Sequence, residues 1–315
     1  MTSINSSSFF HYTKKKKSLL GILRNGFRFS YSFETFDEIV AHSDNDNYLP
    51  MPHLVGTEPQ TVGIAFPMVC FCDIPLMRAG QHRSHYGNYC IGLDKEVTLK
   101  QWSPIINPVH YVNSSWVDDL YRKLAIHKRS LASRVKKEKE FIAEIENASH
   151  DAIPELTEKA KQYIKTAHSF YEFGYTLEQI LRLTKPCDGK DRKGRPVCFY
   201  DEREWRVFWN YNLMSEKKSE EKEDIKYGLS REEFENNKAL WNKAVESDYL
   251  IFEKCSPADV ISHIIVPKEK DIPGVINAIK VETHILGKEV SLFDFDIRSL
   301  LISKVTSFER IERDF

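Results

Sequence analysis

Apolar positions alternate with polar ones, or recur at helical spacing, in the first part of the chain. Residues 9–13 form a short apolar run, and residues 27–31 alternate aromatic with polar side chains; both patterns are typical of β-strands. Between them, apolar residues mark one face of a helix over residues 18–27, with Ser18 suited to its N-cap and Gly26 to its C-cap. The pattern therefore predicts a strand–helix–strand unit.

The remainder of the body is expected to be rich in strands. Ser230 and Glu233 form a capping box and predict a helix to about Ala244. Polar or highly charged composition predicts irregular connections over residues 34–62 and 216–224. The pattern of apolar residues predicts strands over residues 62–73, 88–93, 107–112, 199–209, 249–252 and 260–266.

Residues 114–183 change to helical periodicity. Leucine, isoleucine, valine and aromatic residues recur three or four positions apart, and Pro154 predicts a turn between two long helices. The first helix has a basic segment over residues 122–139, where lysine and arginine greatly outnumber glutamate. Such a run is usually a solvated face, and it is also where a nucleic-acid backbone would bind.

The strand over residues 199–209 carries the main candidate chemistry. Side chains two apart in a strand share a face, so Glu202, Glu204 and Arg206 are expected on one side. A surface ladder of ion pairs would explain this pattern. The alternation alone favours that explanation. A site that uses the carboxylates is the alternative, because charges on a strand rich in buried-type residues are costly unless they are paired or used.

Composition and charge narrow the function classes only slightly. The chain of 315 residues has 45 Lys and Arg against 46 Asp and Glu, so nucleic acid would need a local patch. No apolar run is long enough to span a membrane, and the N-terminus lacks the apolar core of a signal peptide. The six cysteines fit no zinc spacing, so we expect no metal and reduced thiols in a cytoplasmic protein.

Five short motifs occur in an order that is specific as a whole. In sequence they are Phe10-His11-Tyr12-Thr13 with Leu19, Ile22, Leu23 and Gly26; residues 70–76; His85-Tyr86-Gly87 with Gly92-Leu93; residues 202–206; and residues 311–315. Together they resemble the AbiGi family, which is named for abortive infection systems that protect bacteria from phage. The likeness covers nearly the whole chain.

The opening strand–helix–strand unit and the Glu-x-Glu strand are also similar to the ADP-ribosyltransferase superfamily, particularly DNA ADP-ribosyltransferase toxins and RNA 2′-phosphotransferases. This more distant resemblance implies an α+β fold with a split β-sheet core that binds NAD in a cleft. Residues 1–113 and 184–315 would form the two halves of that core. Residues 114–183 would be inserted between them as a long α-helical hairpin.

The same resemblance implies roles for four polar residues. His11, at the edge of the first strand, would hold the donor ribose, although an isolated histidine is as often a core or capping residue. Glu204 would stabilise the oxocarbenium-like ribosyl cation after nicotinamide leaves. Glu202 would activate the acceptor as a general base, and Arg206 would orient Glu204 or neutralise a phosphate.

An aromatic ring should stack on the nicotinamide of the NAD cofactor. Tyr86 or Tyr89 could supply it, and the sequence marks neither position clearly. The remaining residues expected around NAD are Tyr12, Thr13, Arg28, Ser30 and His85.

Three functions follow from these features. The first is an NAD-dependent ADP-ribosyltransferase toxin that modifies single-stranded nucleic acid, RNA rather than DNA by a small margin, and is restrained by an antitoxin partner. The second is a non-enzymatic antitoxin or regulator, in which the core is a degenerate scaffold and the hairpin binds a partner. The third is a sugar-phosphate or RNA-end processing enzyme that uses another donor.

Overall fold

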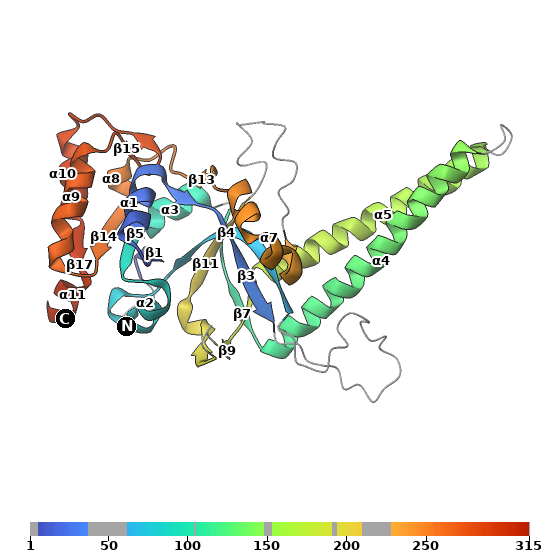
Figure 1. Cartoon of the computed structure of the whole chain (residues 1–315), viewed down its shortest axis with the longest axis horizontal. Helices are drawn as coiled ribbons and strands as arrows, with labels where there is room; N and C mark the ends of the chain where they lie inside the picture. Colours follow the sequence, from blue (N-terminus) through green and yellow to red (C-terminus); the bar gives the residue numbers. More distant parts are fainter. Residues whose placement is uncertain are drawn as a thin grey trace. The chain divides into compact units, whose positions relative to one another are not determined.

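A mixed β-sheet of nine described strands runs through one of the two units into which the chain folds (Figure 1). The computed structural model describes residues 6–36, 62–103, 105–147, 153–190, 194–209 and 228–314. Unit 1 comprises Met1–Thr35, Gly63–Val109 and Val197–Phe315, and unit 2 comprises Phe36–Val62 and His110–Pro196.

Seven strands of unit 1 follow one another across the sheet in the order β17-β14-β5-β1-β4-β11-β6, and β3 and β12 also pair with β4. Strands β14 and β17 are parallel, whereas β1 is antiparallel to both of its neighbours. The bounds are β1 Ser8–Thr13, β3 Ser30–Phe36, β4 Val62–Cys72, β5 Tyr89–Asp94, β6 Ile106–Pro108, β11 Glu204–Phe208, β12 Leu229–Ser230, β14 Ile261–Val266 and β17 Val305–Ser307. The expected α+β class is confirmed.

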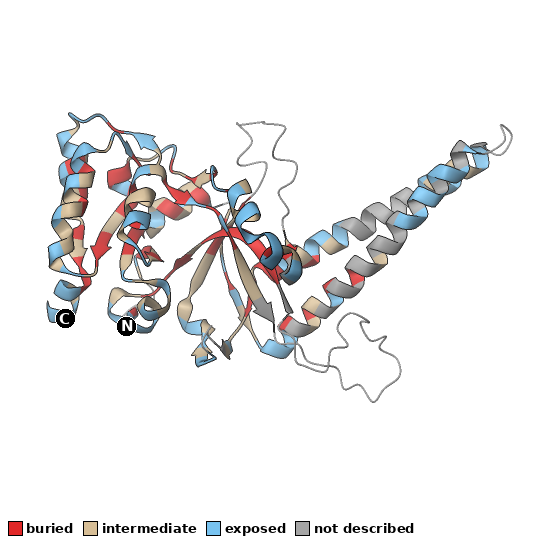
Figure 2. Cartoon of the chain, in the orientation of Figure 1, coloured by how far each residue is buried: buried red, intermediate tan, exposed pale blue. Residues whose placement is uncertain are grey.

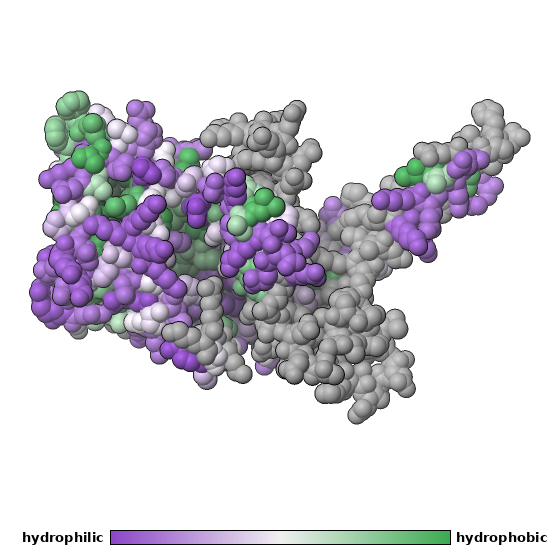
Figure 3. All heavy atoms as spheres, viewed as in Figure 1, coloured by the Kyte–Doolittle hydropathy of each residue, from purple (hydrophilic) through white to green (hydrophobic). Residues whose placement is uncertain are grey.

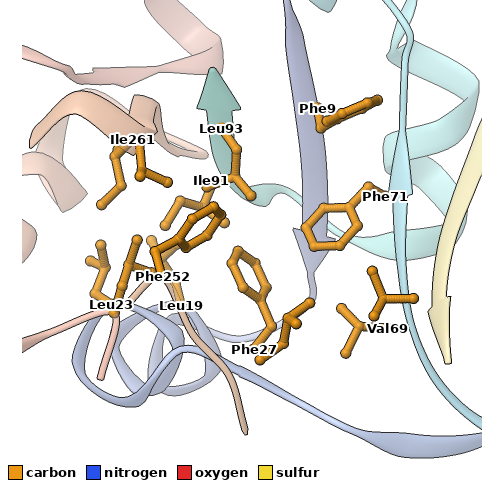
Figure 4. Packing of buried hydrophobic residues seen from close by; sticks show 14 of the residues in the cluster. Phe9, Leu19, Leu23, Phe27, Val69, Phe71, Ile91, Leu93, Phe252 and Ile261 are labelled. Carbon is orange, nitrogen blue, oxygen red and sulfur yellow. The ribbon is translucent and has the colours of Figure 1, made fainter. Parts of the chain in front are cut away.

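One face of this sheet carries the main hydrophobic core. Leu19 and Leu23 of α1 (Lys16–Asn25) pack with strand residues such as Phe9 and Phe71 (Figure 4). Trp102 of α3 (Lys95–Trp102) belongs to the same cluster. Figure 2 shows buried residues concentrated along the strands of the sheet. Because α1 presents its apolar side to the sheet, the helix of the strand–helix–strand pattern covers part of this core.

The opposite face of the sheet carries a smaller cluster. Phe10 and Tyr12 of β1, Cys72 of β4 and Cys90 of β5 pack there with Phe308 of α11 (Phe308–Asp314). The ring of Tyr12 stacks on that of Phe308 with the centroids 6.2 Å apart. Alternation along β1 therefore divides its residues between two apolar layers.

Unit 2 contains two long helices packed against each other, α4 (Ser114–Glu146) and α5 (Ile153–Arg182) (Figure 1). They lie in the segment where two long helices are expected. Pro154 lies in the first turn of α5 rather than in the connection, since the first turn of a helix tolerates a residue without an amide hydrogen. β7 (His110–Val112), which precedes α4, pairs in parallel with β8 (Thr184–Pro186), which follows α5.

The remaining described elements are short or peripheral. They are β2 Phe27–Arg28, η1 Leu76–Arg78, α2 Gly80–Tyr86, β9 Asp188–Lys190, β10 Pro196–Cys198, η2 Phe199–Glu202, α7 Arg231–Ala244, β13 Tyr249–Leu250, α8 Pro257–Val260, η4 Glu269–Asp271, α9 Ile272–Val281, β15 His284–Ile285, β16 Lys288–Glu289 and α10 Phe295–Ser303. None of the described helices is long and apolar enough to cross a membrane.

Further sequence predictions need correction. The helix expected from Ser18 begins earlier, at Lys16, so Lys15 rather than Ser18 is the N-cap of α1. The strand expected over residues 199–209 begins only at Glu204, because residues 199–202 form a 3₁₀ turn and Arg203 has a left-handed backbone with φ of 43°. The irregular connection expected from residue 34 starts later, since β3 runs to Phe36. Most of that connection, and all of the charged segment 216–224, lie outside the described residues.

Candidate functional site

A buried arginine between two carboxylates is the main polar feature of the sheet of unit 1. The Nε of Arg206 donates to Oε1 of Glu204 at 2.8 Å, and its Nη2 lies 3.1 Å from Oε2 of Glu204 and 3.0 Å from Oε2 of Glu34. The side chain of Arg206 is fully buried, and those of Glu34 and Glu204 are 14% and 11% exposed. We call these three residues the arginine cluster.

Electrostatics favours the charged form of this arginine. Burial alone works against a charged guanidinium, and the neighbouring carboxylates of Glu204 and Glu34 outweigh it, so the pKa of Arg206 lies well above its usual range. Two charge-assisted hydrogen bonds from one guanidinium to Glu204 give the pair a bidentate geometry. The arginine cluster therefore joins β11 to β3, although each of these strands pairs directly with β4.

The cysteine beside the arginine cluster is unreactive. Cys70 is paired in register with Arg206, so their side chains emerge on the same face of the sheet. Burial raises the pKa of the Cys70 thiol well above its ordinary value, and the nearby negative charge of Glu204 raises it further. Burial likewise raises the pKa of Cys72 and Cys90. Thiols in such surroundings stay protonated, which excludes them as nucleophiles at neutral pH.

His11 and Glu204 lie on opposite faces of the sheet. Phe10 is paired with Cys72, and Cys72 with Glu204, so these three side chains share a face. His11, one residue further along β1, points to the other face, as Phe9 does. The arrangement expected for the donor site, with His11 and Glu204 lining one hollow, is therefore wrong.

His11 is instead half-buried against aromatic residues of the main core. Its Nδ1 donates to the carbonyl oxygen of Cys70 at 2.8 Å, and its ring centroid lies 5.3 Å from that of Phe27 and 5.8 Å from that of Phe71. Burial disfavours the charged imidazolium and lowers the pKa of His11, and the hydrogen bond to Cys70 offsets this only in part. The imidazole is thus a neutral residue that joins β1 to β4.

The burial of His11 gives a testable dependence of stability on pH. The unfolded chain binds a proton at the ordinary histidine pKa of 6.5, whereas the folded chain does not until the pH is lower. The free energy of unfolding is therefore unaffected by this group above pH 6.5 and falls as the pH drops below it. The fall is at most about 1.4 kcal/mol per pH unit for each such histidine. Urea unfolding of the wild type at pH 7 and pH 5 measures the loss.

A His11→Gln variant keeps a donor for the Cys70 carbonyl and removes the titration, so its loss between pH 7 and pH 5 should be smaller. A His263→Gln variant is the comparison, because burial and the charge of Lys304 lower the pKa of His263 in the same direction. Equal losses in the wild type and the His11→Gln variant would show that His11 does not carry the effect.

Glu202 and Tyr86 form a second pair. The hydroxyl of Tyr86 donates to Oε1 of Glu202 at 2.9 Å, and its ring lies 4.4 Å from that of His82. The left-handed residue Arg203 separates Glu202 from β11, which places it in η2 instead of on the face that Glu204 shares with Arg206. The expectation that Glu202 extends the file of charges on the strand is therefore wrong.

The other expected NAD contacts are dispersed over unit 1. Tyr12 lies in the smaller cluster on the face opposite His11. Arg28 is exposed at the end of β2 and Ser30 at the start of β3, and His85 donates from Nδ1 to the carbonyl of Gln81 within α2. Thr13 and Tyr89 are half-buried partners in the pairing of β1 with β5. The described residues contain no group of three or more His, Cys, Asp or Glu that could hold a metal ion.

Sequence reasoning missed Glu34, the second carboxylate of the arginine cluster. A signal for it exists, since Phe29, Tyr31 and Phe33 alternate with polar residues up to Glu34. This alternation continues the strand beyond the point at which we expect an irregular connection. This alternation could therefore have indicated that Glu34, the second partner of Arg206, lies within a strand.

Comparison with known proteins places these elements in a family. Residues 57–254 match the sequence profile of a family described as "Putative abortive phage resistance protein AbiGi, antitoxin". The chain belongs to the AbiGi family. It is also 24% identical over 266 residues, 79% of this chain and 88% of the other, to an abortive phage resistance protein AbiGi of Lactococcus lactis subsp. cremoris. No solved structure matches.

The family match corrects our main functional prediction. An ADP-ribosyltransferase toxin that modifies nucleic acid is expected from the sequence, whereas the AbiGi family is described as an antitoxin. The resemblance to AbiGi is thus confirmed, and the toxin interpretation is wrong. The separation of His11 from Glu204 agrees with this correction, because the carboxylate and the ribose-holding group of such an enzyme must meet in one site.

Proposed function

We propose that this AbiGi protein is the antitoxin of a toxin–antitoxin pair in phage defence and acts without catalysis, by binding its toxin. The family description carries the proposal. The matched residues 57–254 include both helices of unit 2 and β11 with Glu204 and Arg206, so the likeness extends over both units. An ADP-ribosyltransferase-like ancestry of the core stays a prediction from the sequence.

The arginine cluster supports a structural role for the charged strand. A catalytic carboxylate needs access to substrate, whereas Glu204 directs both of its oxygens to a fully buried guanidinium. Glu34, on β3, forms an ion pair with the same guanidinium. These contacts account for the conspicuous charges of β11 as an internal ion-pair network that holds strands together.

The helical hairpin of unit 2 supplies an arm for partner binding. Near its base, Leu124 is buried, and Gly174 leaves space for the ring of His127 against α5. Other apolar side chains of the hairpin are exposed. Ile142 of α4 and Phe173 and Tyr175 of α5 are each more than half exposed. Large exposed apolar residues on a long hairpin are typical of a surface that another protein covers.

The basic segment of α4 is compatible with a solvated face of this arm. Lys123 pairs with Asp119 at 2.8 Å, and Lys136 lies 4.0 Å from Glu140, both at helical i,i+4 spacing. Exposed pairs of this kind contribute little to stability and keep a helix soluble. Binding of nucleic acid to residues 122–139 stays a prediction.

Neutralisation without catalysis makes a direct prediction for Glu204. The test first expresses the products of the genes on either side of this one singly, to find one that arrests growth, and then co-expresses that product with this chain. We expect growth to recover and a stoichiometric complex to form. A Glu204→Gln variant should restore growth within about twofold of the wild type, whereas loss of a catalytic carboxylate would lower an activity about 100-fold or more.

Glu204→Gln keeps the size of the side chain and one acceptor oxygen for Arg206, so it separates chemistry from folding. Size-exclusion chromatography confirms that the variant is folded before growth is scored. A Glu204→Gln variant that is folded and binds the toxin but does not restore growth would overturn the proposal in favour of an enzyme. Failure of the wild type to bind or restrain the growth-arresting product would overturn it outright.

A further inference from the structure

Four large apolar side chains are exposed together near the end of unit 1. Phe293 is 82% exposed, Phe295 and Val281 are each 69% exposed, and Leu292 is 45% exposed. Figure 3 shows hydrophobic side chains gathered at the upper left of this face, beside α10. Phenylalanine is normally among the most buried residues, and neighbouring exposed aromatics mark contact surfaces. We call these four residues the C-terminal apolar surface.

A single buried arginine holds the backbone beneath this surface. Arg298 of α10 is 4% exposed and donates to the carbonyl oxygens of Ile279 and of Glu282, the latter at 2.9 Å. The same guanidinium donates to the carbonyls of Val290 and Ser291, each at 3.1 Å. It therefore ties the end of α9, next to Val281, to the segment that leads into Leu292.

The segment that carries the aromatic residues has further local support. Oδ1 of Asp294 accepts from the backbone amide of Ile297 at 3.1 Å and caps α10. The backbone amide of Phe293 donates to the hydroxyl of Ser291 at 3.2 Å. The exposed rings thus project from a backbone fixed on both sides. A contact surface held in this way loses little conformational entropy when a partner binds, which raises its affinity.

The charges around the C-terminal apolar surface indicate what kind of partner fits. Residues 280–297 include the carboxylates Glu282, Glu289, Asp294 and Asp296 against two lysines, Lys280 and Lys288. Asp296 is exposed between Phe295 and the rest of α10. Apolar anchors within an acidic border are complementary to an apolar recess bordered by lysine and arginine.

We propose that the C-terminal apolar surface is a docking site for the toxin, and that it receives an apolar recess with a basic border on that protein. This inference rests on the proposed antitoxin function and extends it by naming a surface of unit 1. The aromatic rings of Phe293 and Phe295 fill the recess, and Asp296 meets the basic border. The hairpin of unit 2 is then a separate contact.

The experiment replaces both rings and measures binding to the growth-arresting product of the neighbouring gene. A Phe293→Ser/Phe295→Ser variant should bind it about 30-fold or more weakly and fail to restore growth, because buried aromatic anchors dominate such interfaces. Its melting temperature should match that of the wild type, since both rings are exposed. Leu240→Ser is the matched control, because Leu240 of α7 is 60% exposed and lies outside this surface.

A second variant tests the charge complementarity. Asp296→Asn should slow association with the toxin and weaken the dependence of the association rate on salt, while leaving dissociation nearly unchanged. Wild-type affinity in the double serine variant would overturn the docking site and leave the antitoxin function standing. A change only in self-association of this chain would also overturn it. A wild-type chain that does not bind the growth-arresting product would contradict the antitoxin function itself.

Discussion

Replacing Arg206 with methionine should lower the free energy of unfolding by about 3–5 kcal/mol. Methionine fills much of the same volume, so the loss comes chiefly from Glu34 and Glu204, which are left largely buried without their cationic partner. Urea unfolding at pH 7, followed by circular dichroism, measures the change. We expect this to be among the largest effects of any single substitution in the sheet.

An exposed ion pair provides the comparison for Arg206→Met. Lys123 of α4 pairs with Asp119, and both side chains are well exposed, so Lys123→Met should change the free energy of unfolding by less than about 1 kcal/mol. Glu34→Gln/Glu204→Gln combined with Arg206→Met should recover part of the loss, because no buried charge then lacks a partner. A loss below about 1 kcal/mol in Arg206→Met alone would show that the arginine cluster does not hold β3 to β11.

Gly87→Ala should destabilise the chain by about 3–5 kcal/mol. Gly87 lies between α2 and β5 with φ of 119°, a backbone region that side chains rarely adopt. A Cβ atom there would lie 2.4 Å from the carbonyl oxygen of Thr13 and 2.6 Å from Cα of Lys14, both of which are backbone atoms that cannot rotate away. Backbone strain and overpacking therefore add to each other. Thermal unfolding measures the effect.

Two other glycines separate the causes. Gly194 also has a positive φ, of 76°, and no atom of the described residues lies within 4 Å of its added Cβ, so Gly194→Ala should cost only about 1 kcal/mol of strain. Gly21 lies inside α1 with open space around it, and Gly21→Ala should stabilise by about 0.5–1 kcal/mol through helix propensity. Equal losses at Gly87 and Gly194 would show that contact with the turn after β1 contributes nothing.

The correction of the toxin prediction shows where motif reasoning fails. His11 lies in the strand that the sequence predicts, and Glu204 is the first residue of a strand shorter than predicted. Their relation depends on pairing register across three strands. Because the side-chain period of a strand is two, one position decides whether two residues meet on one face or lie on opposite faces. No local pattern carries that information.

The sequence already suggested an antitoxin as an alternative function. It gains support from the family match over residues 57–254 and from the way in which Arg206 engages both Glu204 and Glu34. The C-terminal apolar surface extends it to residues that the sequence did not single out. Leu292, Phe293 and Phe295 look like ordinary core positions in a linear reading, since only their exposed fractions distinguish them.

Local patterns in the sequence were sufficient for several elements. Apolar spacing predicted the opening strand–helix–strand unit and the two long helices of residues 114–183, and a capping box predicted the helix that follows Ser230. Capping, propensity and periodicity all act within a few residues of each other. Alternation also placed Glu204 and Arg206 on one face of β11, as the structure has them. The AbiGi resemblance likewise rested on the linear order of motifs.

Tertiary structure alone decided what those charges do. Glu34 reaches Arg206 from β3, more than 150 positions away in sequence, and Arg203 turns Glu202 out of the strand by adopting a left-handed backbone. Arg298 holds the segment around Phe293 through carbonyl groups that any sequence would possess. Such contacts arise from the register of strands and the packing of distant segments, and these are set by the whole chain rather than by any short stretch of it.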